Sequence, residues 1–271
     1  MLASLVPGVT TLENAALEPE IDDLIVMLNS MGANIQRLPD DPKKIIIHGV
    51  EKLSGTTHEV ISDRNEAVTF ICAALATKGA INILRINPKI ILTFLRTIEL
   101  MGAKVNGGST EVVVTWTQPL KAISIETEPE PGFMTDWQAT FSVVLTQATG
   151  CSTIIERVWP ARFQHLEDLS HMGAKFNLFN PEVDHPESYY FFNRESDNPK
   201  YFHAAKIFGP TKLSPANFSI NDLRAGASLT LAALTAEGIS VIDNVEFNER
   251  GYEKLADRLC YLGADIQYIK T

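Results

Sequence analysis

The segment IILTFLRTIELMGA, residues 90–103, is the clearest example of the unit that this chain repeats. Its apolar residues recur at intervals of three and four, as on one face of an α-helix, and predict an amphipathic helix. The glycine in the closing Met-Gly-Ala triplet is the residue that most readily adopts the left-handed conformation at a helix end. The predicted buried face consists of Ile91, Phe94, Leu95, Ile98 and Met101.

The same pattern, an amphipathic helix that ends in a glycine triplet, recurs along the chain. Met-Gly-Ala or Leu-Gly-Ala triplets are spaced by 70, 71 and 90 residues and contain Gly32, Gly102, Gly173 and Gly263. Glycines before short β-prone segments are spaced by 71, 71 and 88 residues and comprise Gly8, Gly79, Gly150 and Gly238. Two markers with one period indicate an internal repeat of about seventy residues.

Two further amphipathic helices precede triplets of this kind. One carries an apolar face of Ile21, Leu24, Ile25, Leu28 and Met31, and the other a face of Tyr252, Leu255, Leu259 and Leu262. The β-prone segments after the second set of glycines are residues 9–12, 80–84, 151–155 and 239–242. Further strands are expected at residues 44–48 and 111–116.

A third marker lies where other helices begin. The pairs are Asp63-Arg64, Thr135-Asp136 and Asn221-Asp222, each before a small, apolar segment. Aspartate, threonine and asparagine are good helix N-caps, so these pairs predict helix starts. We expect the apolar helices to be interior and the more charged helices that end in the triplets to be exterior. The pattern predicts an α/β repeat protein; the sequence has no GxGxxG after a strand and no GxxxxGK[ST].

Residues 180–215 break this rhythm. They are rich in proline, aromatic residues and asparagine, and they contain several turn sequences. We expect a loop or a β-hairpin excursion here. The aromatic run at residues 189–192 indicates either local packing within that excursion or an interaction surface.

Composition and charge exclude several classes of protein. The chain has 271 residues, 45% of them hydrophobic, and a formal net charge of -10. Such a charge repels the phosphate backbone of nucleic acids and anionic membrane surfaces, so neither is an expected partner. Residues 1–7 lack the features of a signal peptide, and no apolar run is long enough to span a bilayer. We expect a cytoplasmic protein.

Three cysteines give an odd number without metal-ligand spacing: Cys72, Cys151 and Cys260. We expect all three to be reduced, small core residues without a catalytic role.

Six motifs point to a family. They are ENAALEPEI at 13–21, DRNEA at 63–67, PGFMTDWQ at 131–138, RFQHLEDLSHMGA at 162–174, DLRA at 222–225 and RGYE at 250–253. In this order they resemble the UDP-N-acetylglucosamine 1-carboxyvinyltransferases over essentially the whole chain.

The resemblance implies an inside-out α/β barrel of the enolpyruvyl transferase type. In this family two domains, each with three copies of the repeated unit, enclose a substrate cleft. We therefore expect residues 1–62 to be a one-repeat remnant of the first domain and residues 63–271 most of the second, with an inserted loop at about 180–215. By this interpretation the chain is truncated at its amino terminus. The absent portion carries the family's early lysine and asparagine and its reactive cysteine loop.

The resemblance also implies an activity. The family transfers an enolpyruvyl group from phosphoenolpyruvate to the 3'-hydroxyl of UDP-N-acetylglucosamine, the first committed step of peptidoglycan synthesis. No cofactor and no metal site are expected. Both substrates are anionic, and arginines in the first turn of an interior helix, Arg64 and Arg224, suit their binding.

Motif matches assign roles to further residues. Asp136 is the expected base for the sugar hydroxyl, and Arg250 the expected contact of phosphoenolpyruvate. Asp222 and Arg224 match the pair at the reacting centre, Arg162 a cleft arginine, and Val158 a backbone contact of the nucleotide sugar. Alternatively, Asp136 is an ordinary N-cap, Arg250 a surface arginine, and the other charged residues form structural ion pairs.

Two other functions stay open at this stage. One is a non-catalytic relic that binds a nucleotide sugar or a partner, and the other is the shikimate-pathway enolpyruvyl transferase, whose motifs fit less well. We expect the chain alone to be inactive, since losing one preorganised charge-stabilising group costs about 10²- to 10³-fold in rate. We also expect residues 1–62 to leave apolar surface uncovered, and therefore self-association or pairing with a chain that supplies the missing portion.

Overall fold

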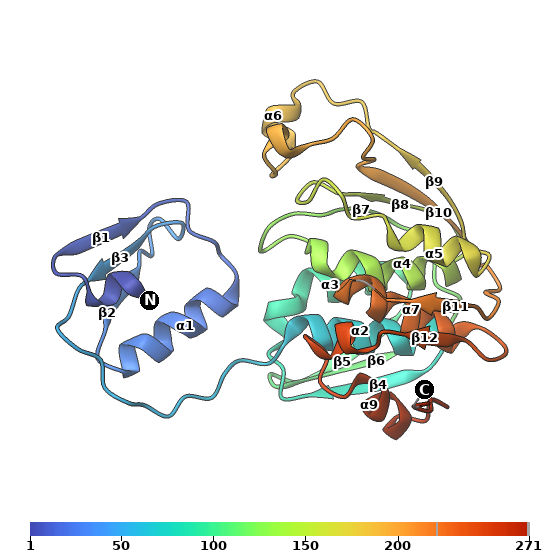
Figure 1. The fold of residues 1–271 in the computed structure, drawn as a ribbon, viewed down its shortest axis with the longest axis horizontal. Helices are drawn as coiled ribbons and strands as arrows, with labels where there is room; N and C mark the ends of the chain where they lie inside the picture. Colours follow the sequence, from blue (N-terminus) through green and yellow to red (C-terminus); the bar gives the residue numbers. More distant parts are fainter. Residues whose placement is uncertain (221, 270–271) are drawn as a thin grey trace. The chain divides into compact units, whose positions relative to one another are not determined.

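A computed structural model describes residues 1–220 and 222–269, without the side chain of Ser196 (Figure 1). The chain divides into two compact units, one of Met1–Ser62 with Pro129–Gly132, the other of Asp63–Glu128 with Phe133–Thr271. No helix among the described residues is long and apolar enough to cross a bilayer.

The first unit contains one repeat. A short helical turn, η1 (Leu2–Leu5), precedes β1 (Val9–Leu12), α1 (Pro19–Ser30), β2 (Asn34–Arg37) and β3 (Ile45–His48). The strands form an antiparallel sheet in the order β1-β3-β2. Leu28 of the predicted helical face is buried with three isoleucines of the sheet, whereas the other four residues of that face are only half-buried.

The second unit begins with a complete repeat. It consists of α2 (Arg64–Ala76), β4 (Ala80–Leu84), η2 (Pro88–Ile91), α3 (Leu92–Met101), β5 (Lys104–Gly107) and β6 (Glu111–Thr115), with the sheet order β4-β6-β5. All five residues of the face predicted from residues 90–103 are buried. Gly102 ends α3 with φ of 106°, the left-handed conformation that the triplet predicts.

The next repeat has the same order with additions. It consists of β7 (Ser124–Glu126), η3 (Thr135–Trp137), α4 (Gln138–Gln147), β8 (Gly150–Ile155), α5 (His165–His171), β9 (Lys175–Phe179), α6 (Pro186–Tyr189), η4 (Arg194–Ser196) and β10 (Ala204–Gly209). Its sheet order is β7-β8-β10-β9, in which β7 is parallel to β8 and the other pairs are antiparallel.

The last repeat is the shortest. It consists of β11 (Asn217–Ser219), α7 (Leu223–Thr235), β12 (Val241–Asp243), α8 (Glu246–Glu249) and α9 (Leu255–Tyr261). Strands β11 and β12 are parallel. Tyr252, Leu255 and Leu259 are buried as predicted. The prediction for Leu262 is wrong, because α9 ends at Tyr261 and leaves Leu262 55% exposed.

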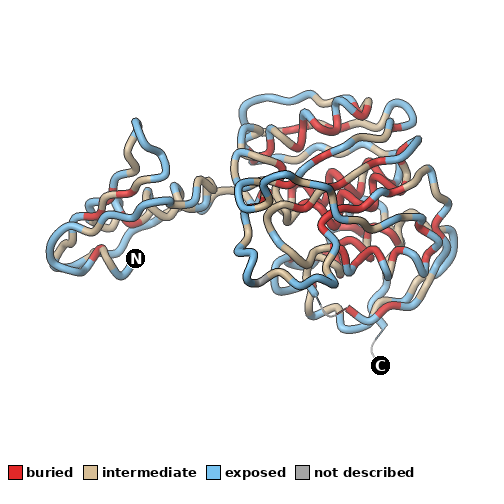
Figure 2. The backbone as a smooth tube through the Cα atoms, turned by 90° about the horizontal axis from the view of Figure 1, so that it is seen from above, coloured by how far each residue is buried: buried red, intermediate tan, exposed pale blue. Residues whose placement is uncertain are grey.

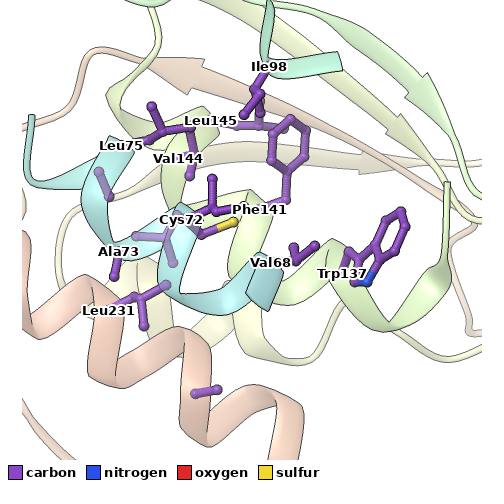
Figure 3. Close-up of a cluster of buried hydrophobic side chains, with 14 of the residues drawn as sticks. Val68, Cys72, Ala73, Leu75, Ile98, Trp137, Phe141, Val144, Leu145 and Leu231 are labelled. Atoms are coloured by element: carbon purple, nitrogen blue, oxygen red, sulfur yellow. The ribbon is translucent and has the colours of Figure 1, made fainter. Parts of the chain in front are cut away.

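Three helices form the interior of the second unit. Helices α2, α4 and α7 contact one another, and strands β4, β6 and β10 pack against α2 or α4 (Figure 1). Figure 3 shows their side chains in one cluster, among them Cys72 of α2, Phe141 of α4 and Leu231 of α7. The buried residues, red in Figure 2, are concentrated in this unit. The prediction that the apolar helices after the third marker are interior is therefore confirmed.

The prediction that all three cysteines are core residues holds only for Cys72. Cys72 is buried, and burial raises the pKa of its thiol well above the usual range. Cys151 and Cys260 are exposed. Cys151 alternates with buried Ser152 along β8, and Cys260 follows buried Leu259 on α9, so both point away from the core.

The irregular segment is shorter than expected. Strand β10 lies within the predicted range of 180–215 and pairs with β8 and β9, as β6 pairs with β4 and β5. β10 therefore divides the predicted range into two irregular parts: the connection between β9 and β10, residues 180–203, which contains α6 and η4, and residues 210–215.

Candidate functional site

Two of the three interior helices begin with an aspartate cap. The Asp63 carboxylate accepts hydrogen bonds from the backbone N–H groups of Asn65 (2.7 Å) and Glu66 (3.1 Å) at the start of α2. The Asp222 carboxylate accepts hydrogen bonds from Arg224 N (3.0 Å) and Ala225 N (2.9 Å) at the start of α7. These contacts are the predicted N-caps; the neighbouring Asn221 lies outside the described residues.

Asp136 behaves differently. It lies in η3, and no side chain caps that turn or the following α4. Asp136 Oδ1 instead accepts hydrogen bonds from Arg162 Nη2 (3.1 Å) and Arg224 Nε (3.1 Å). The other carboxylate oxygen, Oδ2, has no hydrogen-bond partner among the described residues. The interpretation of Asp136 as an ordinary N-cap is thus wrong.

Arg224 connects Asp136 to the interior. Its Nη1 donates to Tyr252 Oη (3.3 Å), which lies 3.0 Å from Thr69 Oγ1 of α2. Burial lowers the pKa of Arg224, but Tyr252 and Asp136 more than compensate and leave this pKa raised. Helices α2 and α7 and η3 therefore share one polar network.

Arg162 connects Asp136 to a buried glutamate. Its Nε donates to Thr135 Oγ1 (3.2 Å), and this hydroxyl donates to Glu156 Oε2 (2.9 Å). Glu156 follows β8 and is only 1% exposed. Its Oε1 accepts from Thr127 Oγ1 (2.7 Å) and from the N–H groups of Val158 (2.9 Å) and Trp159 (3.0 Å).

Glu156 is a site residue that the sequence analysis missed. A buried carboxylate is costly unless it is hydrogen-bonded, and Glu156 has four donors. Burial raises its pKa, and the donors oppose that shift. The signal available in the sequence was a single glutamate at the end of an apolar strand, Thr153-Ile-Ile-Glu156.

Val158 and Trp159 belong to the turn that Glu156 holds. Trp159 is 56% exposed, and its ring centroid lies 5.8 Å from the Arg162 guanidinium carbon. The turn thus adjoins the Asp136 cluster, although the Val158 side chain itself makes no polar contact.

The other two predicted arginines differ in exposure. Arg64, the first residue of α2, is 1% exposed. Arg250 follows α8 and is exposed, with its guanidinium carbon 4.9 Å from the Phe247 ring centroid. Among the described residues, no hydrogen bond or ion pair joins Arg250 to Asp136 or Arg224.

His165 lies next to this cluster. Its Nδ1 is 3.1 Å from Arg162 O, and its Nε2 is buried without a hydrogen-bond partner among the described residues. Burial lowers the pKa of His165 to about 4, and the hydrogen bond with Arg162 O and the nearby Asp222 oppose that shift. The site therefore contains a neutral histidine at pH 7.

The arrangement suits an anionic ligand that bears a hydroxyl group. Arg162 and Arg224 are fixed guanidinium donors, and Asp136 presents one carboxylate oxygen without a protein partner. A carboxylate held in this way can accept a hydrogen bond or a proton from a hydroxyl. No group of histidine, cysteine, aspartate and glutamate residues in the described part of the chain is arranged to hold a metal ion.

Comparison with known proteins identifies the class. A family model described as EPSP synthase (3-phosphoshikimate 1-carboxyvinyltransferase) matches residues 1–259. The chain therefore belongs to this family of enolpyruvyl transferases.

Individual relatives give more detail. The chain is 38% identical over 267 residues to UDP-N-acetylglucosamine 1-carboxyvinyltransferase 2 of Geobacillus kaustophilus, covering 98% of this chain and 57% of the relative. It is 37% identical over 270 residues to UDP-N-acetylglucosamine 1-carboxyvinyltransferase of Halothermothrix orenii, covering 100% and 59%. The chain thus spans little more than half the length of these curated relatives.

Solved structures agree on the fold. The enolpyruvyl transferase NikO from Streptomyces tendae superposes with a TM-score of 0.80 at 28% identity, covering 98% of this chain and 58% of that one. EPSP synthase from Acinetobacter baumannii superposes with a TM-score of 0.67 at 20% identity, covering 99% and 60%, which bears on the fold alone. The fold is therefore a mixed α/β enolpyruvyl transferase fold, and it is partial relative to these structures.

Proposed function

We propose that this chain takes part in the transfer of an enolpyruvyl group from phosphoenolpyruvate to the 3'-hydroxyl of UDP-N-acetylglucosamine. The observation that carries the proposal is the position of Asp136, which is bound by two arginines instead of its own helix. Relatives named for this activity match essentially the whole chain. The product would enter peptidoglycan synthesis, and the reaction would take place in the cytoplasm.

In this proposal Asp136 Oδ2 accepts the proton of the sugar hydroxyl while the hydroxyl oxygen forms a bond to C2 of phosphoenolpyruvate. The C2=C3 π bond breaks in the same step, and C3 takes up a proton from solvent. Arg162 and Arg224 keep the carboxylate oriented through Oδ1. The tetrahedral intermediate then loses phosphate from C2 and a proton from C3, which restores the C2=C3 double bond. Asp222 holds the backbone from which Arg224 extends.

Arg64 and Arg250 would bind the anionic groups. A guanidinium can grip a carboxylate or a phosphate through two parallel hydrogen bonds. The exposed position of Arg250 suits a contact that forms only when phosphoenolpyruvate binds. Val158 would contact the nucleotide sugar through its backbone.

We propose that residues 63–271 form most of an inside-out α/β barrel domain and residues 1–62 one repeat of a second domain. The first unit exposes apolar side chains, among them Leu2 (89%), Val9 (62%) and Val26 (60%). Exposed apolar patches mark association surfaces, so we propose that the chain pairs with itself or with a chain that supplies further repeats. A monomer in light scattering at micromolar concentration would contradict this association.

The activity can be tested by complementation. Phosphate release from phosphoenolpyruvate is measured for this chain alone and with a separately expressed amino-terminal portion of the Geobacillus kaustophilus relative. The chain alone should be inactive. The mixture should release phosphate only with UDP-N-acetylglucosamine, and Asp136→Ala should abolish the release.

Other outcomes distinguish the alternatives. Release that depends on 3-phosphoshikimate and not on UDP-N-acetylglucosamine would assign the chain to the shikimate-pathway reaction. Binding of UDP-N-acetylglucosamine without turnover in any mixture would indicate a non-catalytic binding module.

A further inference from the structure

The connection between β9 and β10 is much longer than its counterparts. Strands β5 and β6 are joined by residues 108–110, and β2 and β3 by residues 38–44, whereas residues 180–203 join β9 and β10. The strand pairing is the same antiparallel hairpin in all three repeats. Because the shorter connections suffice for the hairpin, the fold does not need residues 180–203.

The long connection has a small core of its own. The Tyr190 ring lies 4.9 Å from the Phe192 ring and 5.0 Å from the His203 ring, measured between centroids. His203 Nε2 lies 3.1 Å from Asp197 Oδ1. Tyr190 is 9% exposed and His203 is 6% exposed. The segment is therefore packed and has a defined place.

Arg157 fastens this segment to the turn that Glu156 holds. Arg157 Nε donates to Tyr189 O (3.0 Å), and Phe191 N donates to Arg157 O (2.7 Å). The guanidinium carbon lies 4.3 Å from the Tyr189 ring centroid and 4.9 Å from that of Phe191. Arg157 Nη1 also forms ion pairs with Glu126 (2.8 Å) and Glu128 (2.6 Å), so its position is fixed on both sides.

This contact brings exposed aromatic side chains near the proposed substrate turn. Phe191 is 51% exposed, and its backbone N–H donates to Arg157 O. Trp159, two residues after Arg157, is 56% exposed. Trp159 in turn adjoins Arg162, which binds Asp136. A chain of contacts therefore links the long connection to the centre of the site.

We infer that residues 180–203 are a recognition element for the nucleotide sugar, held beside the Val158–Trp159 turn by Arg157. Aromatic faces stack on nucleobases and on other flat or apolar ring faces. The ligand chemistry is thus a ring presented by the sugar nucleotide, either its uracil or its amino sugar. This inference rests on the proposed function, because it assumes that the turn contacts that substrate.

The test is calorimetric titration of the full chain and its variants with UDP-N-acetylglucosamine and, separately, with UMP. In one variant the connection is replaced by Gly-Ser-Thr, the sequence of residues 108–110, which closes the same hairpin within this chain. Phe191→Ala removes an exposed ring, and Arg157→Gln releases the segment. Arg96→Gln is the matched control, because Arg96 is an exposed arginine of α3 and lies outside residues 180–203.

We expect each of the first three variants to weaken UDP-N-acetylglucosamine binding by about tenfold, the range of one lost aromatic stack, and the control to have no effect. An equal loss for UMP assigns the contact to uracil, and a loss confined to UDP-N-acetylglucosamine assigns it to the sugar. Unchanged affinity of Phe191→Ala and of the replacement variant, with binding by the wild type intact, would overturn this inference alone. No binding by the wild-type chain would overturn the proposed function as well.

Discussion

The starts of α2 and α4 occupy equivalent places in the repeat, yet their aspartates make different contacts. Asp63 turns back to cap its own helix, whereas Asp136 turns away to bind Arg162 and Arg224. Asp222 caps α7, and the side chain of Arg224, two residues later, donates a hydrogen bond to Asp136. The same position of the repeat therefore stabilises a helix start in one copy and forms part of a candidate site in another.

The surroundings of Asp136 explain the difference. Thr135, the residue before it, donates its hydroxyl to Glu156 and so does not cap the helix. Arg162 follows the turn that Glu156 holds and reaches both Thr135 and Asp136. Glu156 is therefore the residue that sets the α4 start apart, and altering it gives the largest expected effect.

We expect Glu156→Ala to lower the free energy of unfolding by about 3 kcal/mol, because one buried and three partly buried donors lose their acceptor. Urea denaturation followed by circular dichroism measures this change. Glu167→Ala, at an exposed position of α5, is the control and should be nearly neutral. A loss below about 1 kcal/mol would mean that the network does not hold the α4 start.

His165 gives the next largest effect, through pH. Its pKa is about 4 in the folded protein and near 6.5 when unfolded, so the unfolded chain binds more protons between these values. Stability should therefore fall as the pH drops through this window, by about 2 kcal/mol between pH 7 and pH 5. His165→Phe should remove this part of the pH dependence. Equal pH slopes for the wild type and the variant would contradict burial of a neutral histidine beside Arg162.

The cap at the start of α2 gives a smaller effect. Asp63→Ala should cost about 1 kcal/mol of unfolding free energy, the usual contribution of an N-cap. Chemical denaturation measures it, and Asp63→Asn, which retains a capping oxygen, should be nearly neutral. If both variants were neutral, Asp63 would not act as a cap.

Asp136→Asn should have the smallest effect on stability, about 0.5 kcal/mol or less. Its side chain and those of both arginines are partly exposed, and such ion pairs contribute little. The same denaturation experiment measures the change. A loss larger than that of Asp63→Ala would show that Asp136 serves the fold, and the contrast between the two helix starts would disappear.

Much of the fold could be predicted from the sequence, because periodicity and glycine caps are local signals. The face around Phe94 and the left-handed Gly102 follow from spacing alone. Exposure of Cys151 and Leu262 could not be predicted, since one depends on which face of β8 is covered and the other on where α9 ends.

The site was predictable only in part. Motif matches selected Asp136, Arg162 and Arg224, which the structure brings together, but not the contact between them, which joins residues far apart in sequence. Glu156 was missed because its role arises from burial, and burial at a strand end depends on tertiary packing. Arg250 is not joined to this cluster by any hydrogen bond or ion pair among the described residues, so its assignment stays a prediction.

Calorimetric titration of the full chain can compare UDP-N-acetylglucosamine binding by Asp136→Asn and Asp63→Asn, which change the two equivalent aspartates in the same way. We expect at least about tenfold weaker binding for Asp136→Asn, since one hydrogen bond to a charged group is lost, and an affinity within about twofold of the wild type for Asp63→Asn. Equal affinities of the two variants would contradict the claim that Asp136 faces the substrate.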